Sequence, residues 1–163
     1  MKVRRGTNKD FEEIWQIEIE DRIYHKKITR KEYSQLNKSK IDKKARIEFL
    51  KWRQKDLKDK NKMFLIAEED NKIMGHIGGH IFKWIWSDNP PKVFNIDTIG
   101  VLSKYKKKGI ATKLIKELEK MLKKKGVKFT YLGVWGKNKP ANKLYKKNNY
   151  KTYRTEMVKK IIP

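Results

Sequence analysis

The sequence predicts an α/β fold in which helices flank a central, mostly antiparallel mixed sheet. Three features indicate this class: apolar runs of strand length alternate with amphipathic helical stretches, turn residues separate them, and neither a repeat nor a linker interrupts the pattern. The chain has 163 residues, which suits one domain spanning 1–163 and is long enough to bury a sizeable core.

The N-terminal third is predicted to contribute one strand and two helices. A short strand is expected at 2–5, and Thr7 then caps a helix, with Asp10 in the capping-box position three residues later. Residues 26–62 are charged and helical in composition. Apolar side chains recur there at helical steps and predict a helix that packs on the sheet through Ile41, Ala45, Phe49 and Trp52.

The rest of the chain is expected to alternate strands and helices. Gly100 lies inside one strand and indicates a bulge or a close backbone approach, and Gly126 is the expected C-cap of the clearest helix. The predicted order is a strand at 63–67, a turn at 69–72, a strand at 73–82, a loop with two tryptophans at 84–91, a strand at 93–101, a helix at 111–125, a strand at 127–134, a helix at 140–147 and a final strand at 150–162.

Composition narrows the classes of function. A hydrophobic fraction of 37% excludes a disordered chain, and the absence of cysteine excludes disulfide scaffolds, thiolate catalysis and cysteine-ligated metals. No targeting segment or membrane-length apolar run is visible, so we expect a cytoplasmic protein without a membrane partner. The net charge of +24 is mostly lysine spread along the chain, which is typical of a solvated surface but also suits anionic ligands.

The most informative segment joins the strand at 93–101 to the helix at 111–125. Such a junction exposes unpaired backbone N–H groups at the positive end of a helix dipole, and Gly109 lets an anion approach closely. The segment lacks the spacing of a Walker loop and the glycines of a dinucleotide-binding turn. It predicts a pyrophosphate cradle, with a tight helix start after a basic loop as the alternative.

Ordered motifs surround this junction. Residues 106–111 read Lys-Lys-Lys-Gly-Ile-Ala, a strand at 96–101 precedes them, and Leu132-Gly133-Val134, Asn138, Ala141, Leu144-Tyr145 and Asn149-Tyr150 follow. In this order and spacing they resemble the GNAT superfamily of acetyl-CoA-dependent N-acetyltransferases, whose central motif is Arg/Gln-x-x-Gly-x-Gly/Ala. Lys106 replaces the first motif residue and keeps its charge without a planar head group. Asn149 replaces a usual glycine and tolerates the left-handed conformation.

The resemblance implies acetyl-CoA as co-substrate and no metal. The amides of Lys107 to Thr112 would hold the CoA pyrophosphate, and the backbone around Gly100 would pair with the pantetheine arm and polarise the thioester carbonyl. Asn138 would hydrogen-bond the pantetheine. The complete set of implied cofactor-binding residues is Ile99, Gly100, Val101, Lys106, Lys107, Lys108, Gly109, Ile110, Ala111, Thr112, Asn138, Ala141, Leu144 and Tyr145.

Two residues are expected to carry the chemistry. Tyr145 lies where the family often places a general acid for the leaving CoA thiolate, and Asp97 lies where several members keep a carboxylate that deprotonates the amine through water. A core tyrosine and a strand-end hydrogen-bonding carboxylate are the alternatives. His76 and His80 share a strand face, but without carboxylate companions they make a poor metal site, so we expect them in the core or the acceptor pocket.

The resemblance therefore implies transfer of an acetyl group to a primary amine of a small molecule, peptide or protein. The alternative function is a nucleic-acid- or ribosome-binding module that keeps the fold and uses its basic surface. The sequence does not specify an oligomeric state, and a homodimer is an expectation only because homodimers are the commonest assembly. For the acidic group 18–21 the alternative is an exposed, charged helix face. The side chains expected to line the acceptor site are Trp15, Glu18, Glu20, Asp21, Tyr24, Trp84 and Trp86.

Overall fold

The sheet is mixed and mostly antiparallel. The computed structural model describes residues 1–29 and 40–161, and its five strands run in the spatial order β1-β2-β3-β4-β5. β1 to β4 pair antiparallel, whereas β4 and β5 pair parallel, which confirms the predicted sheet. The strands are β1 (Lys2–Arg5), β2 (Lys62–Glu69), β3 (Lys72–Lys83), β4 (Lys92–Val101) and β5 (Phe129–Tyr131).

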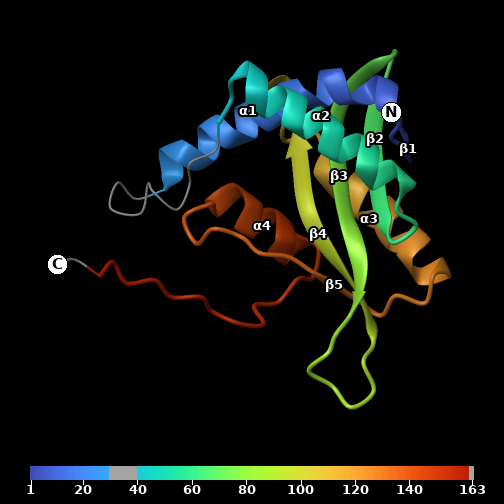
Figure 1. The fold of residues 1–163 in the computed structure, drawn as a ribbon, viewed down its shortest axis with the longest axis vertical. Coiled ribbons are helices and arrows are strands. Elements are labelled where there is room, and N and C mark those ends of the chain that lie inside the picture. Colours follow the sequence, from blue (N-terminus) through green and yellow to red (C-terminus); the bar gives the residue numbers. More distant parts are fainter. Residues whose placement is uncertain (30–39, 162–163) are drawn as a thin grey trace.

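Helices cover both faces of this sheet. Figure 1 shows α1 and α2 on one face, α3 on the other, and α4 beside β4. Each long helix begins after a short turn or cap: a 3-10 turn at Asn8–Asp10 precedes α1, and another at Ser103–Tyr105 lies just before the loop into α3. The helices are α1 (Phe11–Ile28), α2 (Lys43–Lys58), α3 (Ile110–Lys124) and α4 (Lys139–Lys147).

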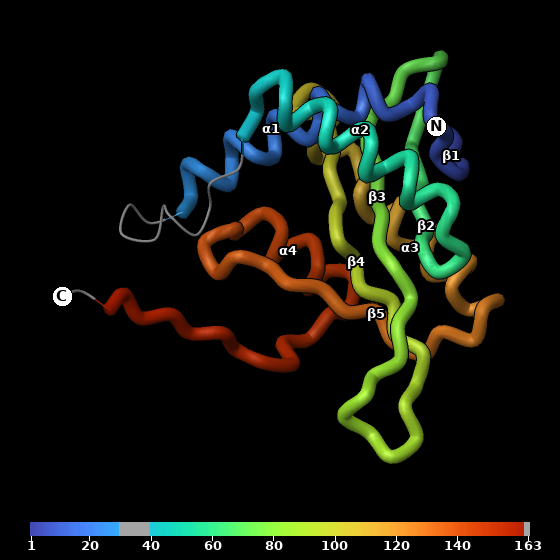
Figure 2. The backbone as a smooth tube through the Cα atoms, in the orientation of Figure 1, coloured from blue at the N-terminus to red at the C-terminus, as the bar shows by residue number. Residues whose placement is uncertain are grey.

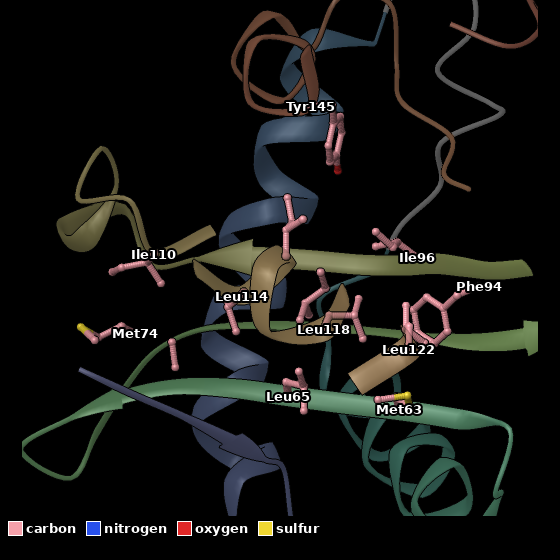
Figure 3. Packing of buried hydrophobic residues seen from close by; sticks show 13 residues of the cluster. Met63, Leu65, Met74, Phe94, Ile96, Ile110, Leu114, Leu118, Leu122 and Tyr145 are labelled. Carbon is pink, nitrogen blue, oxygen red and sulfur yellow. The ribbon is translucent and has the colours of Figure 1, made fainter. Parts of the chain in front are cut away.

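The core consists of two hydrophobic clusters separated by the sheet. One cluster contains the buried side chains of α3, and the other contains those of α1 and α2; they are called the α3 cluster and the α1–α2 cluster. Neighbouring residues of β2 point to opposite faces, so Leu65 packs in the α3 cluster and Ile66 in the α1–α2 cluster. The side chains of the α3 cluster are drawn in Figure 3. Burial of each large aliphatic side chain contributes about 1.5–3 kcal/mol, so the stripe on α3 alone anchors that helix firmly: it comprises Leu114, Ile115, Leu118 and Leu122.

Several local predictions are confirmed. The Asp10 carboxylate accepts hydrogen bonds from the backbone N–H and the hydroxyl of Thr7, at 2.6 and 2.8 Å, and so completes the capping box. Gly126 follows α3 with φ of +70°, and Asn149 follows α4 with φ of +64°. The left-handed conformation after α4 therefore survives the replacement of glycine by asparagine.

β3 and β4 contain the irregularity that positions the site described below. Gly78 pairs with Thr98 and Gly79 with Ile96, so Asp97 is the extra residue of a β-bulge. Gly100 instead marks a close approach, because a Cβ added there would lie 2.6 Å from Cγ2 of Ile17 on α1. The sequence predicted one of these two features at Gly100, and the structure contains both, three residues apart.

The predicted stripe on the second helix is correct only in part. Ala45 and Phe49 are buried, whereas Ile41 precedes the helix and Trp52 is half exposed. Arg53 is buried in place of Trp52, and its guanidinium lies 4.9 Å from the Trp52 ring, which covers it.

The final strand expected at 150–162 is wrong for the residues that the structure describes. Residues 151–161 form no strand, and Figure 2 shows this segment extending away from the sheet. Met157 and Ile161 are 95% and 89% exposed, so the segment buries no apolar face that would offset the entropy of ordering a strand. The strand predicted at 127–134 is also shorter, since only Phe129–Tyr131 pair with β4.

Candidate functional site

The loop between β4 and α3 presents a row of free backbone amides. The Lys106 amide donates to the Ser103 carbonyl at 3.3 Å, and the next backbone bond is from Lys113 to the Gly109 carbonyl at 3.0 Å. Between these bonds, the amides of 107–112 have no hydrogen-bond acceptor in the described part of the chain. Lys107 and Gly109 adopt φ of +66° and +78°, which turns the loop into the N-terminus of α3. Such a row at a helix N-terminus suits an anion.

Positive charge is concentrated around this loop. Residues 101–151 contain 17 lysines and two glutamates, so they carry +15 of the total net charge of +24. The side chains of Lys106, Lys107 and Lys108 are exposed, and the Lys106 ammonium lies 5.9 Å from the Tyr24 ring on α1. A lysine-rich surface of this kind raises the local concentration of phosphorylated ligands.

The edge of β4 that faces β5 is open over half its length. β5 pairs only with Val93, Phe94 and Asn95, so no described strand pairs with residues 96–101 on that side. The predicted residues Ile99, Gly100 and Val101 lie on this open edge and are half-buried. An unpaired strand edge offers N–H and C=O groups to an extended ligand.

α4 borders this open edge. Asn138 caps it, because its side-chain oxygen accepts from the Ala141 amide at 3.1 Å, and its side-chain amide donates to Nε2 of His25 at 3.3 Å. Ala141 and Leu144 are half-buried against the α3 cluster.

Tyr145 projects from α4 into the interior. Its ring lies 5.6 Å from Tyr150, and Figure 3 shows it directed toward β4. Burial, together with Tyr150 and Asp21, raises the pKa of the Tyr145 phenol above its usual range. The phenol therefore stays protonated across the physiological pH range and is able to donate a proton.

Asp97, at the β-bulge, contacts two side chains. Nδ1 of His80 on β3 lies 2.9 Å from one carboxylate oxygen, and the Asn95 side-chain amide donates to the other at 2.6 Å. The expectation that His80 lacks a carboxylate companion is wrong. Sequence reasoning missed this contact because the companion is on the neighbouring strand and faces His80 only through the bulge.

His76 also has a carboxylate companion, and that pair is buried. Its Nε2 lies 3.2 Å from the Glu18 carboxylate on α1 and 3.0 Å from the Thr98 hydroxyl. Burial alone would raise the pKa of Glu18, but the hydrogen bond from His76 and the nearby charges of His76 and Arg53 outweigh it and lower the pKa to about 2. Glu18 therefore stays ionised in the interior.

The side chains expected to line the acceptor site have several different roles in the structure. Trp15 is a core residue against Phe49, and Trp86 is 84% exposed. Glu20 accepts a hydrogen bond from the Ser103 amide at 2.8 Å and fixes the start of the basic loop. Of the side chains expected to line the acceptor site, only Trp84 belongs to an aromatic cluster near Asp97 and His80. The cluster contains Phe82, Trp84, Tyr131 and Tyr153.

The described residues 1–29 and 40–161 contain neither a metal-binding cluster nor a membrane-spanning helix. No group of three or more histidine and acidic side chains there is arranged to hold a metal ion. No helix there is long and apolar enough to cross a membrane.

Comparison with known proteins finds likenesses in sequence and in structure. An N-alpha-acetyltransferase of Saccharolobus solfataricus is 35% identical over 101 residues, which are 58% of this chain and 60% of that protein. The BH1408 protein of Bacillus halodurans superimposes with a TM-score of 0.86 at 18% identity, covering 99% and 100% of the two chains. A ribosomal-protein-alanine N-acetyltransferase of Brucella melitensis has a TM-score of 0.67 at 16% identity, covering 99% and 100%.

A family model agrees with these likenesses and spans the site. The model of the acetyltransferase (GNAT) family matches residues 11–150, from the start of α1 to the end of the turn after α4. That range includes the free amides, the open edge of β4, Tyr145 and Asp97. The chain belongs to the GNAT acetyltransferase family.

Proposed function

We propose that this acetyltransferase uses acetyl-CoA and transfers the acetyl group to the α-amino group of a polypeptide. The observation that carries the proposal is the continuity of two binding features. The open edge of β4 leads directly into the row of free amides at 107–112, so a long ligand with an extended arm and a pyrophosphate has matching partners along one path.

Three groups of residues would hold the co-substrate. The amides of 107–112 and the lysines around them would bind the pyrophosphate, and the edge at Ile99 to Val101 would pair with the pantetheine amides. Asn138, Ala141 and Leu144 would close the other side from α4. Bound acetyl-CoA supplies the activated acetyl group, and a free N–H of the β4 edge would stabilise negative charge on its carbonyl oxygen.

Tyr145 is the general acid of this proposal. Its raised pKa keeps the phenol protonated. Because a phenol has a higher pKa than a thiol, Tyr145 would contribute a hydrogen bond to the developing thiolate and a proton as the C–S bond breaks. Asp97 would act in removing the proton from the incoming ammonium group. It is on the same strand as Ile99, two residues away, or about 7 Å along an extended chain.

The acceptor class follows from the local surroundings and from one relative. The Asp97 pair and four aromatic rings lie together, so a cationic amine attached to an apolar or amide-bearing chain would find both charge and contact area. The Saccharolobus solfataricus relative is an N-alpha-acetyltransferase, a name that favours a polypeptide α-amine over a sugar amine.

The test combines binding with transfer. Acetyl-CoA and CoA at about 100 times their dissociation constants should each stabilise the protein by roughly 2.7 kcal/mol, and ATP should not. Thiol release should then be measured with a peptide that has a free α-amine, the same peptide blocked at its N-terminus with one free lysine, and an aminoglycoside. Binding without release from the first peptide would contradict the acceptor class, and no binding would contradict the co-substrate.

Tyr145→Phe provides the matched control within the site. The variant should bind acetyl-CoA as tightly as the natural protein and lower the turnover number by about 10-fold or more, since general acid catalysis typically contributes 10²–10⁴-fold. An unchanged turnover number would mean that Tyr145 is a core tyrosine.

A second candidate function is supported by the charge of 101–151. Seventeen lysines in that part of the chain would also suit an RNA surface. RNA binding that falls steeply with salt and is not displaced by CoA would favour this function, whereas displacement by CoA would mean that both ligands use the phosphate cradle.

A further inference from the structure

All three histidines lie beside a carboxylate, but their ring nitrogens differ in what they contact. In His25, Nδ1 lies 3.0 Å from Asp21 and Nε2 accepts from Asn138, so both nitrogens are engaged. In His76, Nε2 faces Glu18 and the side chain is 1% exposed, which leaves no route to solvent. His25 is able to take a proton only by breaking one of these contacts. Nδ1 of His76 has no hydrogen-bond partner in the described residues, but its burial keeps it from an incoming substrate.

His80 differs in both respects. Its Nδ1 lies 2.9 Å from Asp97, and its Nε2 has no hydrogen-bond partner in the described ranges 1–29 and 40–161. The His80 side chain is 38% exposed. Because an ionised carboxylate only accepts, Nδ1 must carry the ring proton, and the lone pair of Nε2 is then free.

Asp97 is less available than the sequence suggested. One of its oxygens accepts from His80 and the other from the Asn95 amide, at 2.9 and 2.6 Å. Both carboxylate oxygens are therefore already engaged by side chains of the protein. The same bonds fix the orientation of the imidazole, as the carboxylate partner of a catalytic histidine does.

The charged surroundings of His80 favour this assignment. On β4 the facing charge is Asp97, and on β2 it is Lys62, the register partner of His80. The Lys62 ammonium is paired with Asp56, which reduces its effect on the imidazole. The Phe82 ring packs beside the imidazole, with the two ring centroids 5.8 Å apart.

We propose that His80 is the general base of the transfer reaction, with Asp97 and Asn95 as positioning residues. This assignment rests on the proposed function. Nε2 accepts a proton from the substrate ammonium group, directly or through one water, and the freed lone pair forms the C–N bond at the thioester carbonyl. The C–S bond then breaks, the thiolate takes the Tyr145 proton, and the second proton of the acylated nitrogen returns to Tyr145. The imidazolium releases its proton to solvent.

The experiment compares His80→Gln, His80→Ala, Asp97→Asn and Asp70→Asn. Asp70 lies in the turn between β2 and β3, has φ of +49°, which asparagine tolerates, and is a matched control for Asp97→Asn. Each protein is first checked for unchanged thermal unfolding and acetyl-CoA binding. Turnover with the α-amine peptide is then measured from pH 5 to 9, and the imidazole ¹⁵N shifts of His80 are recorded at pH 8.

The expected results separate the base from its positioning residue. His80→Gln should lower kcat by 10²-fold or more and abolish the rise of activity with pH, and added imidazole should restore part of the rate to His80→Ala. Asp97→Asn should lower kcat about 10-fold but keep the rise of activity with pH, because the imidazole loses the carboxylate that orients it and keeps its own lone pair. Asp70→Asn should match the natural protein. The ¹⁵N shifts should report the Nδ1–H tautomer.

Other results would overturn the assignment. A larger loss in Asp97→Asn than in His80→Gln would make Asp97 the base, as would a His80→Gln profile that keeps its rise. An Nε2–H tautomer would also overturn it, whatever the activity. A natural protein that binds acetyl-CoA but acetylates no amine would overturn the proposed function itself, and this assignment with it.

Discussion

Two imidazole–carboxylate pairs lie four residues apart on the same face of β3, and they are built in opposite ways. The His76–Glu18 pair uses Nε2, at 3.2 Å, and His76 is 1% exposed. The His80–Asp97 pair uses Nδ1, at 2.9 Å, and His80 is 38% exposed. Each carboxylate also accepts from a third side chain on β4: Thr98 in the buried pair and Asn95 in the exposed pair.

From this difference we infer that the burial of a side chain, more than its chemistry, decides its role. α1 lies over β3 and β4 at His76, where Ile17 packs so close to Gly100 that a Cβ on Gly100 would lie 2.6 Å from it. Beyond that point the face opens at the bulge of Asp97. The buried pair fastens α1 to the sheet, and the exposed pair has a nitrogen available for proton transfer.

The largest effect that tests this comparison is on stability. Glu18→Gln keeps the shape of the side chain but removes its charge, leaving His76 and Arg53 facing a neutral amide in the interior. We expect the free energy of unfolding to fall by about 3 kcal/mol, the scale of a broken buried ion pair. Asp97→Asn, the matched change in the exposed pair, should cost about 0.5 kcal/mol or less. Urea denaturation of both variants measures the difference, and equal losses would contradict it.

The pH dependence of stability gives the next largest effect. Glu18 has a pKa of about 2 in the folded protein and an ordinary value of 4.5. A lowered pKa stabilises the folded state above pH 4.5, and this contribution is lost as the pH falls from 4.5 toward 2. Between pH 4.5 and 3 the loss should reach about 2 kcal/mol.

Glu18→Gln isolates that contribution. Asp10, whose pKa is also lowered despite its burial because Arg4 and Thr7 hydrogen-bond it, titrates in both proteins and cancels in the comparison. The natural protein should therefore lose more stability between pH 4.5 and 3 than the variant does. Parallel curves would mean that Glu18 titrates normally and that the buried pair contributes nothing by its charge.

The row of free amides at 107–112 could be predicted from the sequence, because the signals for a strand-to-helix junction are local. Gly109, the lysines before it and the amphipathic stripe of α3 lie within about 20 residues, and a glycine at a strand-to-helix junction has few structural interpretations. Asn138 caps α4, a structural role that its motif did not predict, and its contact with a pantetheine arm stays a prediction.

The two imidazole–carboxylate pairs could not be predicted in the same way. Glu18 and His76 are 58 residues apart in the chain, and no periodicity links α1 to β3. The bulge that brings Asp97 to His80 has no residue signature, since the glycines that pair across it are on the other strand. The prediction of a final strand at 150–162 was wrong for a related reason. The β-propensity of a segment depends on pairing with a neighbouring strand, and the described sheet provides no such strand for residues 151–161.

The smallest effect concerns Thr98 and Asn95, the side chains that donate hydrogen bonds to the carboxylates of the two pairs. The Thr98 hydroxyl donates to Glu18 at 3.2 Å and lies 3.0 Å from Nε2 of His76, so Thr98→Val removes a shared hydrogen bond without changing the shape of the side chain. The expected cost is about 1 kcal/mol. Asn95→Ala removes the corresponding donor to Asp97 and should change the stability by about 0.5 kcal/mol or less, because the pair is solvated, but it should slow acetyl transfer several-fold as Asp97 loses its orientation. If Thr98→Val slowed transfer and Asn95→Ala did not, the reacting amine would lie beneath α1, and the two pairs would exchange their roles.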